Sequence, residues 1–163
     1  MSGVFGSDGK QVPQGFKNLP HFAELQQAAS CALTTPTVAT VVTDADCWAA
    51  GDQSPTNALG GPLVSATAGT ITITKAGNYE IEYGQSDLTV VTTQVITLQV
   101  FGGAAGTTAL GGISKSTQLT AAPLVMAGKC FAACAVGDII TLKVIASTGN
   151  YTSAAGFLLV KEI

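Results

Sequence analysis

The sequence predicts a single all-β domain, a sandwich or barrel, and two observations carry this prediction. From residue 37 onward valine, isoleucine and threonine dominate, and breaks containing glycine, proline or asparagine recur about every 8 to 15 residues. The clearest stretch, residues 69–88, alternates apolar with polar side chains, and a period of two is that of a β-strand. A chain of 163 residues is long enough for one compact domain and short for two.

The first 35 residues differ from the rest and are predicted to form an extended arm with one short helix. Residues 1–20 contain glycine and proline and have no periodic apolar pattern. Their spaced apolar residues are typical of an arm that docks onto a partner's surface. Beyond Pro20, the residues Phe22, Leu25 and Ala29 would share one side of a helix, which predicts about two turns over residues 21–29. The candidate contact residues of the arm are Val4, Phe5, Val12, Phe16, Leu19 and Phe22.

The rest of the chain, residues 36–163, is predicted to form the β domain. Two strands joined by a tight turn at residues 75–77 account for the alternation of residues 69–88. A weak strand is expected at 116–124, because Pro123 cannot donate a hydrogen bond to a neighbouring strand. Further strands are expected at 37–46, 92–103, 126–136, 138–147 and 156–163, with loops at 48–63, 102–112 and 147–155.

Charge is scarce in this sequence, and its scarcity excludes several classes of protein. Charged residues make up 10% of the chain, whereas about a quarter is usual, and all seven basic residues are lysine. A net charge of −3 without a basic face argues against nucleic-acid binding. No run of about 20 apolar residues is present that could span a membrane, and no secretory signal is visible. The surface is therefore covered by uncharged polar groups or is partly buried against other subunits.

The residues that could carry chemistry predict no enzyme, no metal site and no cofactor. One histidine, His21, lies in the arm, so a triad of nucleophile, histidine and acid is implausible. Glu80 and Glu82 lie on one face of a strand, about 7 Å apart, but few aromatic residues are available to line a sugar-cleaving cleft. Free, buried thiols are expected for the four cysteines, Cys31, Cys47, Cys130 and Cys134.

Three stretches resemble a known family. The sequence GTITITKAGNYEIEY at 69–83, the sequence GDIITLKV at 137–144 and the terminal GFLL at 156–159 occur in this order. Together they resemble the jelly roll of tumour necrosis factor and of the complement globular head, to which domains in bacteriophage virion proteins and bacterial exosporium proteins are similar. The resemblance covers about residues 65–163. It implies an antiparallel jelly-roll sandwich that assembles as a homotrimer around a three-fold axis.

The resemblance also implies which residues face the axis. Tyr79, Ile81 and Tyr83 would lie between the sheets, and the trimer interface would include Glu80, Glu82, Leu158 and Val160. Glu80 and Glu82 depart from the family, which often has apolar or aromatic residues at these positions. They need lysine partners, for which Lys143 and Lys161 are candidates, or an axial cation or solvent. Alternatively this face is solvated and lies away from the axis, and the sequence leaves both arrangements open.

These features together predict a non-enzymatic structural protein of a bacteriophage virion. It would be a trimeric decoration or cement protein, or a head-fibre protein, on the capsid surface, with the major capsid protein or another virion protein as partner of the arm. The alternative is a receptor- or carbohydrate-binding tip domain of a tail fibre or adhesin. A cytokine-like or spore-coat module is a third interpretation, which neither a signal peptide nor a collagen-like repeat supports.

Overall fold

The structure, a computed structural model, describes residues 22–27, 31–33, 40–41, 48–53, 66–67, 69–88, 94–118, 124–146 and 151–163. These residues form thirteen β-strands and no helix. The prediction of an all-β chain is therefore confirmed. No helix with the length and hydrophobicity of a membrane span occurs in this part of the chain.

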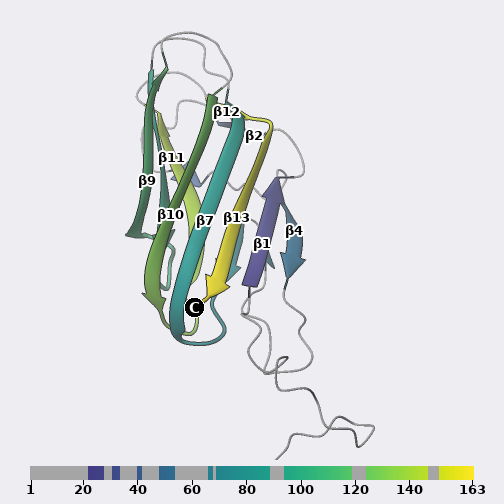
Figure 1. Cartoon of the computed structure of the whole chain (residues 1–163), viewed down its shortest axis with the longest axis vertical. Coiled ribbons are helices and arrows are strands. Elements are labelled where there is room, and N and C mark those ends of the chain that lie inside the picture. Colours follow the sequence, from purple (N-terminus) through teal and green to yellow (C-terminus); the bar gives the residue numbers. More distant parts are fainter. Residues whose placement is uncertain are drawn as a thin grey trace, which may run out of the picture.

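One layer of the sandwich is an antiparallel five-stranded sheet that carries both the first and the last described strand (Figure 1). The strand order is β10-β7-β13-β1-β4. The bounds of these strands are Leu124–Cys134, Gly77–Leu88, Ala155–Glu162, Phe22–Gln27 and Trp48–Gln53. The longest strand, β7, pairs with β10 on one side and with β13 on the other.

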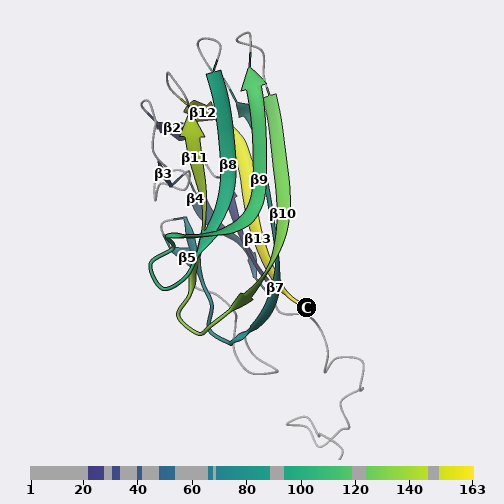
Figure 2. The same ribbon diagram turned by 90° about the vertical axis from the view of Figure 1, so that its left-hand side faces the viewer.

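The second layer lies behind the first and comes into view in Figure 2. Its strand order is β5-β6-β11-β8-β9, with bounds Ala66–Thr67, Thr70–Thr72, Ile139–Ala146, Gln94–Gly102 and Thr108–Gln118. Strand β3 (Thr40–Val41) also pairs with β11. A small separate pair joins β12 (Tyr151–Ser153) to β2 (Cys31–Leu33). Two antiparallel sheets facing each other are the architecture of a jelly-roll sandwich.

The core lies between the two sheets and follows from the period-two alternation of the strands. Tyr79, Ile81 and Tyr83 of β7 are at most 1% exposed, as predicted. The second sheet contributes alternate apolar residues of β8 and β11 to the same core, among them Ile96, Leu98, Val100, Ile140, Leu142 and Val144. Because successive side chains of a strand point to opposite faces, the residues between these core positions form the outer faces of the sandwich.

A tyrosine joins the two sheets through the core. The Tyr83 hydroxyl of β7 donates a hydrogen bond to the carbonyl oxygen of Gly112 in β9 at 2.6 Å, and its distance to the Leu98 carbonyl oxygen of β8 is 3.2 Å. Gly111 and Gly112 have positive φ angles of 119° and 58°, where the register of β9 against β8 shifts. Glycine is favoured at these positions because other residues rarely adopt positive φ.

The predicted helix at residues 21–29 is wrong, because Phe22–Gln27 forms β1 in the five-stranded sheet. Ala23 and Leu25 are each 1% exposed, so the buried positions follow a period of two instead of the helical set expected. Alanine, glutamate, leucine and glutamine all favour helices, but pairing with β13 on one side and β4 on the other overrides this local preference. This part of the predicted arm therefore belongs to the sandwich.

Three predicted loops contain strands. Residues 48–53 form β4 where a loop was expected over 48–63, residues 108–112 begin β9, and residues 151–153 form β12. The expected strand at 116–124 is also wrong in its bounds, because 116–118 end β9 and Leu124 begins β10. The other expected strands match β8, β10, β11 and β13 closely. Of the expected strand 37–46, the described part is β3.

Candidate functional site

The outward-facing side chains of β10, β7, β13 and β1 form one continuous surface, here called the outer face. The strand register arranges them in rows that run across the four strands. One row is Phe22, Lys161, Glu80 and Phe131; the next is Glu24, Leu159, Glu82 and Lys129; the third is Gln26, Phe157, Gly84 and Ala127. The first two rows contain the charged groups. The third row is uncharged, and so is the pair Asn78 and Ala133 on the other side of the first row, so the charges lie in the middle of the face.

Lys129 holds the two carboxylates at the centre of the outer face. Its Nζ lies 2.7 Å from Oε1 of Glu80 and 3.0 Å from Oε1 of Glu82. Neither of the lysines expected as partners from the sequence is the ion-pair partner. Lys161 is opposite Glu80 in the register of β13, whereas Lys143 lies in the second sheet, with its Nζ 4.6 Å from the centre of the Phe101 ring.

This arrangement keeps Glu80 ionised. The hydrogen bond from Lys129 lowers the pKa of Glu80 below its ordinary value, and the bond in turn raises the pKa of Lys129. A general acid of a glycoside hydrolase requires the opposite shift, a raised carboxyl pKa. The geometry of the cluster is therefore that of an ion pair. Among the described residues, no group of three or more His, Cys, Asp or Glu side chains could hold a metal ion.

Large apolar side chains flank the charged centre of the outer face. Val125 and Phe131 of β10 are 70% and 60% exposed, and Ile163, after β13, is 63% exposed. Phe157 is 36% exposed, and its ring lies over Gly84, where a Cβ atom would come within 2.6 Å of it. Such a concentration of exposed apolar groups on one face is typical of an interaction surface.

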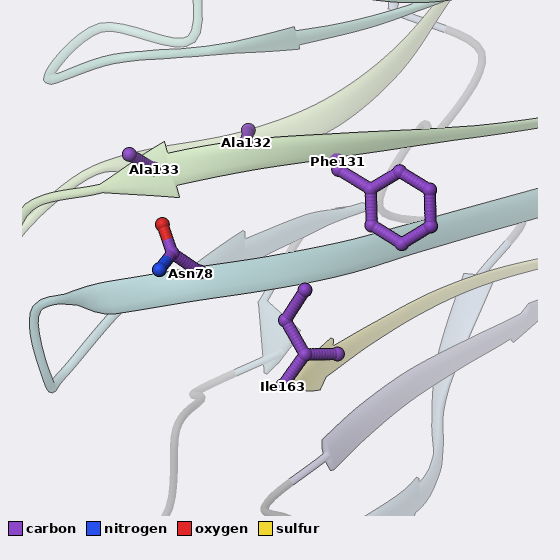
Figure 3. Close-up of a pocket in the computed structure, with 5 residues that line it drawn as sticks. All are labelled: Asn78, Phe131, Ala132, Ala133 and Ile163. Carbon is purple, nitrogen blue, oxygen red and sulfur yellow. The ribbon is translucent and has the colours of Figure 1, made fainter.

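Two shallow grooves accompany these apolar groups. The first, about 480 Å³, is lined by Asn78, Phe131, Ala132, Ala133 and Ile163 (Figure 3). The second, about 460 Å³, lies around Phe157 near the other end of the face, and Glu24, Gln26, Ser86, Val125 and Ala155 are part of its lining. The first groove has no charged side chain in its lining, and the second has one, Glu24.

The structure separates the four residues predicted for the trimer interface. Glu80 and Glu82 lie on the outer face, half-buried beside Lys129. Leu158 and Val160 are 0% exposed and pack in the core, so the expectation that these two side chains face a partner is wrong. They pair with Tyr83 and Ile81, which also point inward, because directly paired residues lie on the same face of a sheet.

Of the six residues predicted to form the contact surface of the arm, the structure describes one, Phe22. Phe22 lies on β1 with its side chain half-buried on the outer face. Val4, Phe5, Val12, Phe16 and Leu19 lie outside the described residues. Lys129, Phe131 and Phe157 are not identified from the sequence as surface residues of interest. Lys129 and Phe131 flank the buried Cys130, so the period of two along β10 predicts the outer face for both.

Cys130 and Cys134 are free and buried, as predicted. They share the inward face of β10 because four residues separate them on a strand. Burial raises the pKa of both thiols, that of Cys134 to about 11. A buried thiol that stays protonated is a poor nucleophile and a poor metal ligand.

No family model matches the sequence, and no curated protein matches it either. The structure is nevertheless similar to solved structures. Murine APRIL at pH 5.0 gives a TM-score of 0.64 at 15% identity, covering 89% of this chain and 100% of that chain. The globular domain of zebrafish complement 1qA gives 0.52 at 14% identity, covering 89% and 96%. The vertex protein P5 of phage PRD1 gives 0.56 at 11% identity, covering 90% and 99%.

The chain has a TNF-like jelly-roll fold. The resemblance noted over residues 65–163 is thereby confirmed, and the structural similarity to murine APRIL extends over 89% of this chain. In this TNF-like jelly roll, β1 and β13 are neighbours in the five-stranded sheet. The outer face is thus built from strands drawn from both ends of the chain.

Proposed function

We propose that this chain is a non-enzymatic structural protein of a bacteriophage virion, a trimeric capsid decoration, cement or head-fibre protein. In this proposal it lies on the capsid surface and binds the major capsid protein or another virion protein through its N-terminal arm. The observation that carries the proposal is the outer face, an apolar surface with a paired ionic centre on a TNF-like jelly roll. The structural similarity to a phage vertex protein supports it.

The outer face is suited to contact between copies of the chain. Strands β10, β7, β13 and β1 contain 11, 12, 8 and 6 residues and lie about 4.8 Å apart, so they form a surface of roughly 20 by 31 Å. This is close to the roughly 800 Å² per partner that a specific interface buries. The pairing of Lys129 with Glu80 and Glu82 matters here, because a charge buried without a partner would strongly oppose association.

A trimer would bind a shell through mass action and avidity. A protein that binds the assembled lattice and not its separated subunits stabilises the lattice by the free energy of binding. Three arms on one trimer multiply weak contacts, because the second and third arms bind at a high effective concentration. The arm residues that would contact the shell are Val4, Phe5, Val12, Phe16 and Leu19. Phe22, the sixth residue predicted for this contact, lies in β1 on the outer face and would contribute from there.

The trimer is tested by two matched variants. Val125 on the outer face and Val136 on the turn between β10 and β11 are 70% and 65% exposed, so neither contributes to the core. Val125→Asp should dissociate the trimer, whereas Val136→Asp should leave it intact, as measured by light scattering after gel filtration. A wild-type chain that stays a single subunit at micromolar concentration would contradict the trimer.

Shell binding is tested by removing the arm without damaging the fold. A deletion of residues 2–19 leaves β1 complete. The truncated chain should keep its trimer and its circular dichroism spectrum but no longer co-sediment with capsids. Equal decoration of shells by the truncated and full chains would contradict the role of the arm. Adsorption of the protein to host cells or to glycan arrays, without binding to capsids, would favour the tail-fibre alternative instead.

A further inference from the structure

The groove at the C-terminal end of the outer face is open, and no charged side chain lines it. Phe131 of β10 and Ile163 after β13 both extend over β7, and Asn78 lies at the start of that strand (Figure 3). Ala132 and Ala133 complete the lining. Phe131 and Ile163 each leave more than half of their surface exposed. A groove of this kind gains free energy when apolar side chains cover it.

The chain enters the fold beside this groove. Phe22, the first residue of β1, pairs with Lys161 of β13, two residues before Ile163. Continuing this antiparallel register by two residues would bring Pro20 opposite Ile163. Proline has no backbone N–H and cannot extend the hydrogen-bonded ladder, so the ladder is expected to end there. The backbone N–H of Ile163 donates instead to the carbonyl oxygen of Asn78, at 3.1 Å.

The apolar residues just ahead of β1 can reach the groove from the same chain. Pro20 continues the line of β1, and from β1 to β10 is three strand spacings, about 14 Å. An extended chain spans at most about 3.5 Å per residue, so the four residues from Pro20 back to Phe16 cover up to about 14 Å. If the register continued to Pro20, Leu19 would be the next residue after the position opposite Ile163, and a fully extended chain would bring Phe16 to the Phe131 wall.

We infer that residues 16–19, here called the arm root, occupy this groove in their own chain. Leu19 packs against Ile163 and Phe16 packs against Phe131, and the Asn78 amide hydrogen-bonds the backbone that crosses between them. This arrangement narrows the shell contact proposed above from the whole arm to its distal apolar residues, Val4, Phe5 and Val12. The inference concerns the protein without a shell, so it stands or fails separately from the capsid-binding role.

Two lysines in the arm make this inference measurable by limited trypsin digestion of the full chain. Lys17 lies within the arm root and Lys10 lies ahead of it. Cleavage after Lys17 should be slower than cleavage after Lys10 by roughly tenfold or more. Trypsin cleaves the arm root only when it has left the groove, and burial of one large apolar side chain reduces the population of that open form by about this factor. Equal rates at the two lysines would overturn the inference.

Groove variants supply the second readout. Phe131→Ser and Ile163→Ser should each accelerate cleavage after Lys17 and leave cleavage after Lys10 unchanged. Both side chains are exposed in the described fold, so their removal should not unfold the sandwich. Val136→Ser is the matched control, because Val136 is 65% exposed outside the groove, and it should change neither rate. An unchanged rate of cleavage after Lys17 in both groove variants would overturn the inference.

Disulfide trapping distinguishes the chain's own arm from that of a second copy. The double variant Lys17→Cys with Ala133→Cys should form a bond within one chain, which keeps the single-chain mass on a non-reducing gel. Each single variant serves as a control for the native cysteines. A bond between two chains would overturn the inference and assign the groove to the arm of a neighbouring copy. No specific bond in the double variant would overturn it as well.

Discussion

Removal of the Tyr83 hydroxyl tests how much the link between the two sheets contributes to stability. In Tyr83→Phe the core keeps its ring, but the Gly112 carbonyl oxygen loses a donor at 2.6 Å. Tyr83 is 1% exposed, and Leu98, whose carbonyl oxygen also faces the hydroxyl, is 0% exposed, so water cannot easily take the place of the lost donor. A buried polar group left without its partner costs about 1–3 kcal/mol. We therefore expect the free energy of unfolding to fall by about 2 kcal/mol and the melting temperature to fall by roughly 4–8 °C.

Tyr79→Phe is the matched control for this measurement. The Tyr79 hydroxyl donates to the carbonyl oxygen of Lys75 at 2.5 Å, in a turn whose residues are exposed. Water can replace that donor, so the loss should stay below about 1 kcal/mol. Urea unfolding followed by circular dichroism, at equal chain concentration, measures both variants. A loss in Tyr79→Phe equal to or larger than that in Tyr83→Phe would refute the reasoning.

Alkaline pH gives an independent test of the same burial. Desolvation raises the pKa of Tyr83 to about 12, whereas the unfolded chain has a tyrosine pKa near 10. Above pH 10 the unfolded state loses this proton first, so stability should fall as the pH rises from about 10 to about 12. The fall should be smaller in Tyr83→Phe. Burial also raises the pKa of Tyr79 to about 12, so the Tyr83 signal is the difference in tyrosinate absorbance between the wild type and Tyr83→Phe. This difference should appear near pH 12, and a difference that appears near pH 10 in the folded protein would contradict the burial of Tyr83.

Two further changes test the outer face and the close packing beneath it. Lys129→Met should raise the pKa of Glu80, as measured by NMR, and an unchanged pKa would contradict the ion pair. In the wild type the ionised Glu80 stabilises the fold at pH values above its ordinary pKa. This contribution is lost as the pH falls through the lowered pKa of the folded state. Gly156→Ala places a Cβ atom 2.7 Å from the side-chain Cδ of Gln85, so the free energy of unfolding measured in urea should fall by about 1–3 kcal/mol. In the control Gly77→Ala the nearest atom to the new Cβ lies 3.6 Å away, so the free energy of unfolding should be almost unchanged.

The sequence predicted the core of β7 because its two faces differ in polarity. Tyr79, Ile81 and Tyr83 alternate with glutamates, and this contrast assigns the inward face without further information. In β13 the same rule gives no answer, because Phe157, Leu158 and Leu159 are all apolar. Which residues of β13 point into the core is decided by the pairing of β13 with β7, and the sequence alone does not give this pairing. The trimer-interface prediction failed at Leu158 and Val160 for this reason.

The predicted loop at residues 102–112 is wrong in its second half, which begins β9 of the second sheet, because its glycines are typical of loops. The run from Gly102 to Gly112 contains five glycines and reads as a flexible loop. The loop itself is short, and Gly111 and Gly112 lie inside β9, where positive φ angles accommodate a shift in register. A bulge and a loop use glycine for the same conformational reason, so composition alone does not distinguish them.

The site was partly predictable. Glu80 and Glu82 were singled out because two carboxylates on one strand face need a partner, and the structure supplies one. That partner is Lys129, which lies 49 residues after Glu80 and 47 after Glu82 and is brought alongside them by the register of β10 against β7. Without that register, lysines on any other strand were equally reasonable candidates. The exposed Phe131 belongs to the same missed strand face.

The carboxyl terminus of the chain has a practical consequence for handling the protein. Ile163 is a wall of one groove, and the C-terminus lies at the same end of the sandwich as the start of β1 (Figure 1). An affinity tag or display cargo fused after Ile163 would emerge directly at that groove and compete for its surface. Recombinant material for digestion and assembly measurements should therefore carry no extension there, or one that is removed by cleavage before use.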